Sequence, residues 1–157
     1  MSSVEISKEA IEELKKFKLP ENMGFGQTFA PVMCLADYDN GSWGPLKMIP
    51  YQNISLAPTA KVFHYAQEIF EGLKAYYSDG KGPYLFRPEE NMERFIRSGN
   101  RMAMPEVPRE YFMDSIVEMV AHCAPFIPQG EGESLYLRPF MMATEEALGI
   151  KPSTKFK

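Results

Sequence analysis

Prolines divide residues 88–128 into two windows, and each window has room for one helix. A proline is accepted at the first position of a helix, whereas further inside it removes an amide hydrogen and ends the helix. Pro88 suits a first helical position, and Pro105 and Pro108 separate the windows. The first window carries one apolar stripe, formed by Met92, Phe95, Ile96, Gly99, Met102 and Ala103. The second carries another, formed by Phe112, Ile116, Met119, Val120 and Cys123. We therefore expect amphipathic helices near residues 88–103 and 109–124.

Sequences typical of tight turns predict strands in much of the remaining chain. The Asp39-Asn40-Gly41-Ser42 turn separates β-forming runs at 28–38 and 46–51, which predicts strand, hairpin and strand. The Asp79-Gly80-Lys81-Gly82 turn predicts a second hairpin between residues 72–77 and 84–86. A further strand is expected over residues 135–144. Residues 55–65 contain proline and are expected to be irregular.

The N-terminus predicts one more helix, with apolar positions at Ile6, Ala10, Ile11, Leu14 and Phe17 and an N-cap at Ser7. Strands and helices are thus segregated along the chain. This order favours an α+β fold with a mainly antiparallel sheet flanked by helices. We expect an N-terminal helical extension over residues 1–22, followed by one domain over residues 23–157.

The composition narrows the class of protein. The 157 residues are 45% hydrophobic and carry a net charge of −4, with no cluster of Lys and Arg, so nucleic acid is not an expected partner. Apolar runs are short, so no membrane association is expected. Cys34 and Cys123 lie far apart in a chain too large to need a disulfide, which favours the cytoplasm. His64 and His122 are scattered, and no metal site is expected.

Two groups of residues are candidates for chemistry. In the strand around residue 136, Leu135 and Leu137 face one side, while Tyr136 and Arg138 face the other. This face is either an anion-binding surface or a solvated strand face with an ion pair. On the helix expected at 88–103, arginines recur at positions 94, 97 and 101. They form either a solvated face or a face from which one arginine reaches a phosphate, and the spacing alone does not choose.

No periodic pattern explains three aromatic residues, Phe25, Tyr65 and Phe70. They are either core side chains or walls of a pocket. Around them a resemblance becomes visible. It is carried by five segments in order: residues 25–29 (FGQTF), 64–76 (HYAQEIFEGLKAY), 85–88 (LFRP), 91–94 (NMER) and 134–139 (SLYLRP). Together they resemble the N-terminal part of branched-chain amino acid aminotransferases, which are fold-type IV pyridoxal-phosphate enzymes. Some segments are shared more loosely with D-amino acid transaminases and aminodeoxychorismate lyases.

The resemblance implies a small domain that binds part of the substrate and of the cofactor. Arg94 would bind the phosphate of pyridoxal 5'-phosphate, and Arg138 would orient polar groups of the substrate. The walls of an aliphatic pocket would be Phe25, Phe70 and Tyr136. The residues that reach across a homodimer interface would be Tyr65, Leu148 and Ile150. The implied substrates are Leu, Ile and Val with 2-oxoglutarate, in amino-acid biosynthesis.

The resemblance also implies what this chain does not carry. In the family, the lysine that binds the cofactor covalently lies in a larger C-terminal domain, so no catalytic residue is expected among these 157 residues. The chain alone is expected to be inactive. Two alternatives stay open: a non-catalytic binding or interaction module, and another fold-type IV enzyme such as a D-amino acid transaminase or an aminodeoxychorismate lyase.

Overall fold

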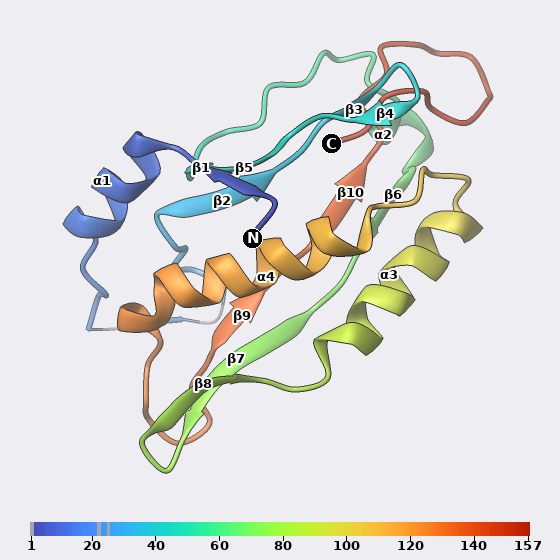
Figure 1. Cartoon of the computed structure of the whole chain (residues 1–157). Helices are drawn as coiled ribbons and strands as arrows, with labels where there is room; N and C mark the ends of the chain where they lie inside the picture. The colour runs from blue at the N-terminus through green and yellow to red at the C-terminus, as the bar shows by residue number, and fades with distance from the viewer. Residues whose placement is uncertain (1, 22, 25) are drawn as a thin grey trace.

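A long antiparallel ribbon runs diagonally through the molecule (Figure 1). The structure is a computed structural model that describes residues 2–21, 23–24 and 26–157. In the ribbon, β6 (Glu68–Phe70) pairs with β10 (Phe140–Met142), and β7 (Leu73–Ser78) pairs with β9 (Leu135–Leu137). The strand β8 (Lys81–Leu85) extends the ribbon beyond β7 through the expected hairpin.

The strand expected over residues 135–144 is divided into β9 and β10 at Arg138 and Pro139. Proline has no amide hydrogen to continue the ladder, so the pairing pauses there. The partner side pauses too, and the Glu71 amide donates to the Pro139 carbonyl at 2.8 Å. The interruption leaves a turn at residues 71–72, between β6 and β7, where the regular strand pairing of the ribbon stops.

A second sheet has the order β1 (Val4–Ile6), β5 (Leu46–Pro50) and β2 (Val32–Leu35). The antiparallel β2–β5 pair was expected, although β2 is shorter than residues 28–38. The strand β1 was not expected, because three residues are too few to show alternation, and Ile6 belongs to it rather than to the helix. It pairs with β5 in parallel, and α1 (Lys8–Lys16) follows, with the Ser7 hydroxyl capping the Ala10 amide as expected.

Two helices cover the inner face of the ribbon, α3 (Pro88–Arg101) and α4 (Arg109–Cys123), the latter continued by the 3-10 turn η1 (Ala124–Phe126) (Figure 1). Both proline-bounded helices are therefore confirmed. Their apolar stripes and the ribbon form the main core, which includes Ile69, Leu73, Ala75, Phe95, Phe112, Ile116, Leu137 and Met141. A smaller core lies between α1, the second sheet and α4, and includes Ala10, Leu14, Val32, Met48 and Cys123.

The last residues of the chain lie between two strands. Phe156 is buried and forms bridges to Tyr38 and Ala143, so the segment joins the hairpin of β3 (Tyr38–Asp39) and β4 (Ser42–Trp43) to the end of β10. Trp43 in this hairpin packs on Tyr38 at 5.3 Å between ring centroids, and its indole Nε1 donates to the Glu106 carbonyl at 2.9 Å. The hairpin is thereby held against the loop between α3 and α4.

The α+β class with mainly antiparallel pairing is confirmed, and β1–β5 is the parallel pair among the described strands. One short helix, α2 (Lys61–Tyr65), forms where an irregular segment was expected. Within the described ranges, no helix is both long and apolar enough to cross a membrane. In the same ranges, His, Cys, Asp and Glu side chains form no group of three that could hold a metal ion.

Candidate functional site

The turn Phe70-Glu71-Gly72 between β6 and β7 is the centre of the candidate site. Each of its three residues contacts a side chain from elsewhere in the sequence. Phe70 lies under the Arg138 guanidinium, whose carbon is 4.4 Å from the ring centroid. Glu71 reaches α3, and Gly72 lies against the Tyr136 side chain on β9. One turn therefore brings together residues that are more than 60 positions apart in the sequence.

Glu71 is a buried carboxylate that holds Arg94. Its side chain is 3% exposed, whereas that of Arg94 is 60% exposed. The carboxylate accepts hydrogen bonds from Arg94 Nε at 2.5 Å and Arg94 Nη2 at 2.7 Å, and from Asn91 Nδ2 at 2.9 Å. This two-pronged arrangement fixes the plane of the guanidinium. Because a guanidinium has five N–H donors, further donors remain on Nη1.

The same contacts set the ionisation of the pair. Burial raises the pKa of the Glu71 carboxyl, but the hydrogen bonds from Arg94, Asn91 and the Gly72 amide outweigh burial, so the pKa lies below its ordinary value. The hydrogen bond and the charge of Glu71 raise the pKa of Arg94. Both groups are thus charged at neutral pH, and Arg94 presents a fixed positive charge at the surface.

Gly72 is required by close packing. A Cβ atom at this position would collide with the Tyr136 hydroxyl. The hydroxyl in turn accepts a hydrogen bond from Arg138 Nη2 at 3.0 Å, and the Arg138 guanidinium carbon is 5.3 Å from the Tyr136 ring centroid. Phe70, Tyr136 and Arg138 therefore form one cation–aromatic cluster on the exposed face of the ribbon. The alternation expected for this strand is confirmed, since Leu137 is buried in the core and Arg138 is exposed.

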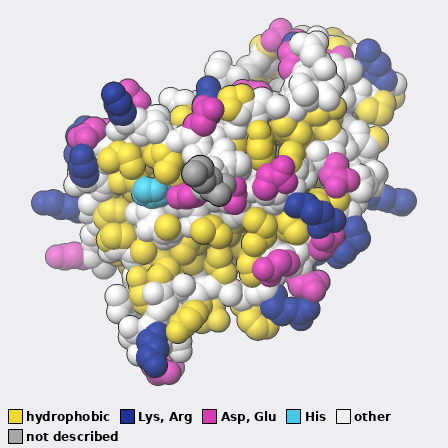
Figure 2. Space-filling view, in the orientation of Figure 1, with side chains coloured by type: hydrophobic (Ala, Val, Ile, Leu, Met, Phe, Trp, Pro, Cys, Tyr) yellow, Lys and Arg dark blue, Asp and Glu magenta, His cyan; other side chains and the backbone are white. Residues whose placement is uncertain are grey.

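Two hollows border the partners of this turn. A cavity of about 1030 Å³ is bordered by Tyr136, Arg138 and the cross-strand neighbour Lys74, with apolar side chains of β2 and α4. A shallow hollow of about 420 Å³ is bordered by Arg94, Arg97, Ser98 and Arg101. Figure 2 shows hydrophobic side chains gathered over the centre of the molecule, across the region where Figure 1 places α4 and the ribbon. A mostly apolar cavity with few polar groups is typical of a small-molecule site.

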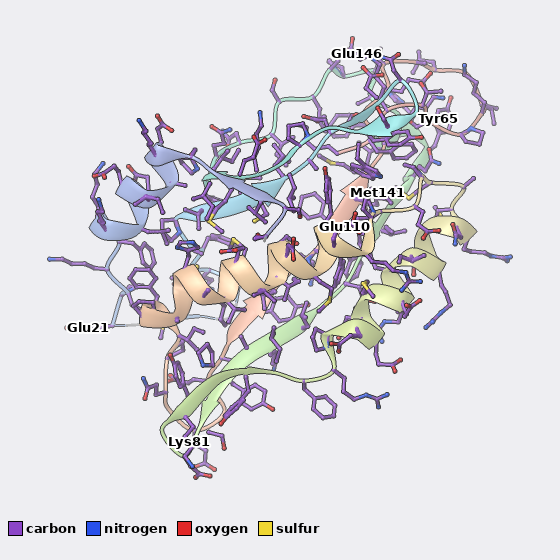
Figure 3. The ribbon with its side chains drawn as sticks, in the orientation of Figure 1. Glu21, Tyr65, Lys81, Glu110, Met141 and Glu146 are labelled. Carbon is purple, nitrogen blue, oxygen red and sulfur yellow. The ribbon has the colours of Figure 1, made fainter. Side chains whose placement is uncertain are left out.

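The remaining candidate residues form a second group at another end of the molecule. Tyr65, at the end of α2, donates a hydrogen bond from its hydroxyl to the Leu148 carbonyl. Leu148 and Ile150 lie in the loop after β10 and are both exposed. Figure 3 shows Tyr65 and Glu146 at this end, far from Lys81 at the β7–β8 turn.

The structure thus divides the predicted site residues. It brings Phe70, Tyr136 and Arg138 into one cluster and places Arg94 beside it through Glu71. Tyr65 and Phe70 are exposed, so neither is a core side chain. Phe25 lies outside the described residues. Glu71 was not among the predicted site residues, although its place in the Phe-Glu-Gly segment was a usable signal.

Comparisons with known proteins identify the family. The chain is 44% identical over 140 residues to branched-chain-amino-acid aminotransferase 2 of Bacillus subtilis, covering 88% of this chain and 38% of that protein. It is 46% identical over 140 residues to the branched-chain-amino-acid aminotransferase of Mycolicibacterium smegmatis, covering 87% of this chain and 38% of that protein. This chain belongs to the branched-chain-amino-acid aminotransferase family. The chain spans about two fifths of the length of these relatives. No protein-family model matches it.

Solved structures of aminotransferases share the fold. The T.th. branched-chain amino acid aminotransferase, complexed with N-(5'-phosphopyridoxyl)-L-glutamate, aligns with a TM-score of 0.56 and 25% identity, over 80% of this chain and 39% of that one. The Escherichia coli branched-chain amino acid aminotransferase aligns with a TM-score of 0.55 and 23% identity, over 77% of this chain and 38% of that one, and shows the fold alone. The resemblance seen in the sequence is therefore confirmed.

Proposed function

We propose that this chain is the substrate- and phosphate-binding part of a branched-chain aminotransferase that transfers an amino group between Leu, Ile or Val and 2-oxoglutarate. The observation that carries the proposal is the arrangement around residues 70–72. Within a chain related to aminotransferases, one turn holds an exposed cation at Arg94 on one side and a cation–aromatic cluster on the other. These are the two recognition elements that a phosphate-bearing cofactor and an amino-acid substrate need.

The residues present fit pyridoxal 5'-phosphate. A phosphate dianion matches a guanidinium held in a fixed plane, and Arg94 is held this way by Glu71. Asn91 and the Gly72 amide donate hydrogen bonds to the Glu71 carboxylate and hold it in place. Binding a phosphate therefore requires little reorganisation of Arg94. When bound, the cofactor supplies the electron sink that amino-group transfer requires. The 157 residues supply the binding of its phosphate in this proposal.

The ribbon face supports binding of two unlike substrates. Phe70 and Tyr136 offer ring surfaces to a branched aliphatic side chain, while Arg138 and the Tyr136 hydroxyl offer hydrogen bonds to a carboxylate. Phe25 is proposed to complete this wall. Tyr65, Leu148 and Ile150 are proposed to close the pocket of a second copy in a homodimer. Exposed apolar side chains on a loop support this role.

The test compares the 157-residue chain with the protein translated from the same reading frame past Lys157. The longer protein should transfer an amino group from leucine to 2-oxoglutarate and retain pyridoxal phosphate through gel filtration. The 157-residue chain should do neither to a comparable degree. A longer protein that is active only on D-amino acids, or only as a lyase, would contradict the substrate class. A longer protein that binds amino acids without any reaction would favour a binding module.

A further inference from the structure

A lysine with no exposed surface lies at the start of α2. Lys61 is fully buried, and its ammonium is surrounded by three acceptors. The Lys61 Nζ atom lies 3.0 Å from the Lys151 carbonyl, 3.4 Å from the Pro152 carbonyl and 3.1 Å from Glu145 Oε2. An ammonium has three hydrogens, so three converging acceptors satisfy it completely. Lysine is seldom fully buried. The burial of Lys61 is compensated by these three partners of its ammonium.

All three acceptors belong to one loop, residues 145–153, and the loop has further ties to the same segment of chain. The Lys61 amide donates to the Glu145 carbonyl at 3.0 Å, and the Ser153 amide donates to Gln67 Oε1 at 3.0 Å. The Thr154 amide donates to Glu145 Oε2 at 2.7 Å. Both ends of the loop are therefore fastened to residues 61–67.

The middle of the fastened loop carries apolar side chains into solvent. Leu148 is 58% exposed and Ile150 is 93% exposed. The Leu148 carbonyl accepts the hydroxyl of Tyr65, which lies one helical turn after Lys61. A loop whose backbone is fixed at its two ends and near its middle presents these two side chains in one arrangement. Such an arrangement lowers the entropy lost when the side chains meet a partner.

We propose that Lys61 is a positioning residue, whose buried ammonium holds loop 145–153 so that Leu148 and Ile150 meet the aliphatic side chain of the substrate in the pocket of a second copy. The role of the loop at a pocket rests on the proposed function. The fastening itself does not, because it is built from contacts within this chain. Lys61 therefore acts from outside the pocket, through the shape of the loop.

The first experiment measures loop order in the 157-residue chain by amide hydrogen exchange. Lys61→Met keeps most of the side-chain volume and removes the ammonium. It should speed exchange of the Ser153 and Thr154 amides by at least about tenfold, while Ala75 in the core keeps its protection. The matched control is Lys151→Met, because Lys151 also faces Glu145, at 3.9 Å, but is exposed. The control should leave all three amides unchanged.

A second variant keeps the experiment decisive if Lys61→Met does not fold. Glu145→Gln preserves the shape of the acceptor and removes its charge, so it should speed exchange of the same two amides by a smaller factor. Unchanged exchange at Ser153 and Thr154 in every folded variant would overturn the fastening role of Lys61.

The second experiment measures substrate selection in the longer protein. Lys61→Met should raise the KM for the leucine keto acid about threefold or more relative to the KM for 2-oxoglutarate, with kcat retained. A variant that is merely less stable would lower kcat through the fraction folded and leave both KM values alone. That result would overturn the positioning role. If the longer protein has no transaminase activity, the proposed function fails, whereas the hydrogen-exchange result still decides whether Lys61 fastens the loop.

Discussion

Two ion pairs in this chain are built in opposite ways. In the Glu71–Arg94 pair the anion is buried and the cation is exposed, whereas in the Lys61–Glu145 pair the cation is buried more deeply than the anion. The buried member is saturated with hydrogen bonds in both. Glu71 accepts from Arg94, Asn91 and the Gly72 amide, and Lys61 donates to Glu145 and two carbonyls.

The difference shows which charge is available to a ligand. A buried carboxylate behind an exposed guanidinium orients the cation and leaves it open to an anion, so this pair suits binding. A buried ammonium uses all its hydrogens within the chain, so this pair suits holding a loop. The number of salt bridges would not distinguish the two cases, whereas the burial of each partner does.

The largest expected effect contrasts the two glutamates. Glu145→Ala leaves the Lys61 ammonium buried with an acceptor removed, and should lower the free energy of unfolding by about 3 kcal/mol. Glu71→Ala leaves an exposed Arg94 that water can solvate, so it should lower the free energy of unfolding by only about 1–2 kcal/mol, through lost hydrogen bonds. Urea denaturation of the 157-residue chain at pH 7 measures both. Equal losses of unfolding free energy in the two variants would contradict the distinction between a pair that holds a loop and a pair that presents a charge.

The next effect concerns the exposed cation. In the longer protein, Arg94→Ala should weaken retention of pyridoxal phosphate by about 10- to 100-fold, the range expected for losing a hydrogen bond to a charged group. Arg101→Ala is the matched control, because Arg101 lies two turns further along α3 and borders the same hollow. It should change the dissociation constant little. Equal small changes would reduce Arg94 to part of a solvated helix face.

Acid should weaken both pairs. Burial raises the pKa of Glu145, but hydrogen bonds from the Thr154 amide and Lys61, with nearby positive charge, lower it overall, and the pKa of Glu71 is also lowered. A lowered folded-state pKa gives stability that is complete above the ordinary value of 4.5 and is lost as pH falls through the folded-state value.

Glu71→Gln and Glu145→Gln should therefore be less stable than the parent at pH 7 and approach it in acid. Urea midpoints at a series of pH values measure this. A constant difference between variant and parent over the whole series would show that the carboxylates do not titrate in the way their hydrogen bonds imply.

The smallest expected effect is on substrate preference. Arg138→Met in the longer protein keeps much of the side chain over Phe70 and removes the guanidinium. The ratio of kcat/KM for 2-oxoglutarate to that for the leucine keto acid should fall by about 2- to 10-fold. The assay is steady-state kinetics at matched cofactor occupancy. A uniform loss with an unchanged ratio would mean that Arg138 supports the ribbon rather than reading the substrate.

Elements with a strong local signal could be predicted from the sequence. The helices α3 and α4 were bounded by prolines and carried clear apolar stripes, and both hairpins had Asp and Gly at their turns. The strand β1 and the helix α2 could not be predicted in this way. Each is too short for periodicity, and β1 exists because β5, some 40 residues later, offers a free edge to pair with.

The candidate site followed a similar rule. Alternation placed Tyr136 and Arg138 on one face without knowledge of the fold, because it depends on neighbouring residues only. The partners Glu71 and Lys61 were missed. Their roles depend on contacts 23 residues away in one case and 90 in the other, and a polar residue in a short strand or irregular segment gives no sign that it will be buried.

The packing of Trp43 gives this chain its own optical probe. It is the single tryptophan of the sequence, its ring lies close to Tyr38, and its indole N–H is bonded to the loop between α3 and α4. Emission from one indole therefore reports on one place, where the hairpin, the helical layer and the bridge to Phe156 meet. Quenching and emission wavelength at this position follow the seating of the hairpin without any attached dye.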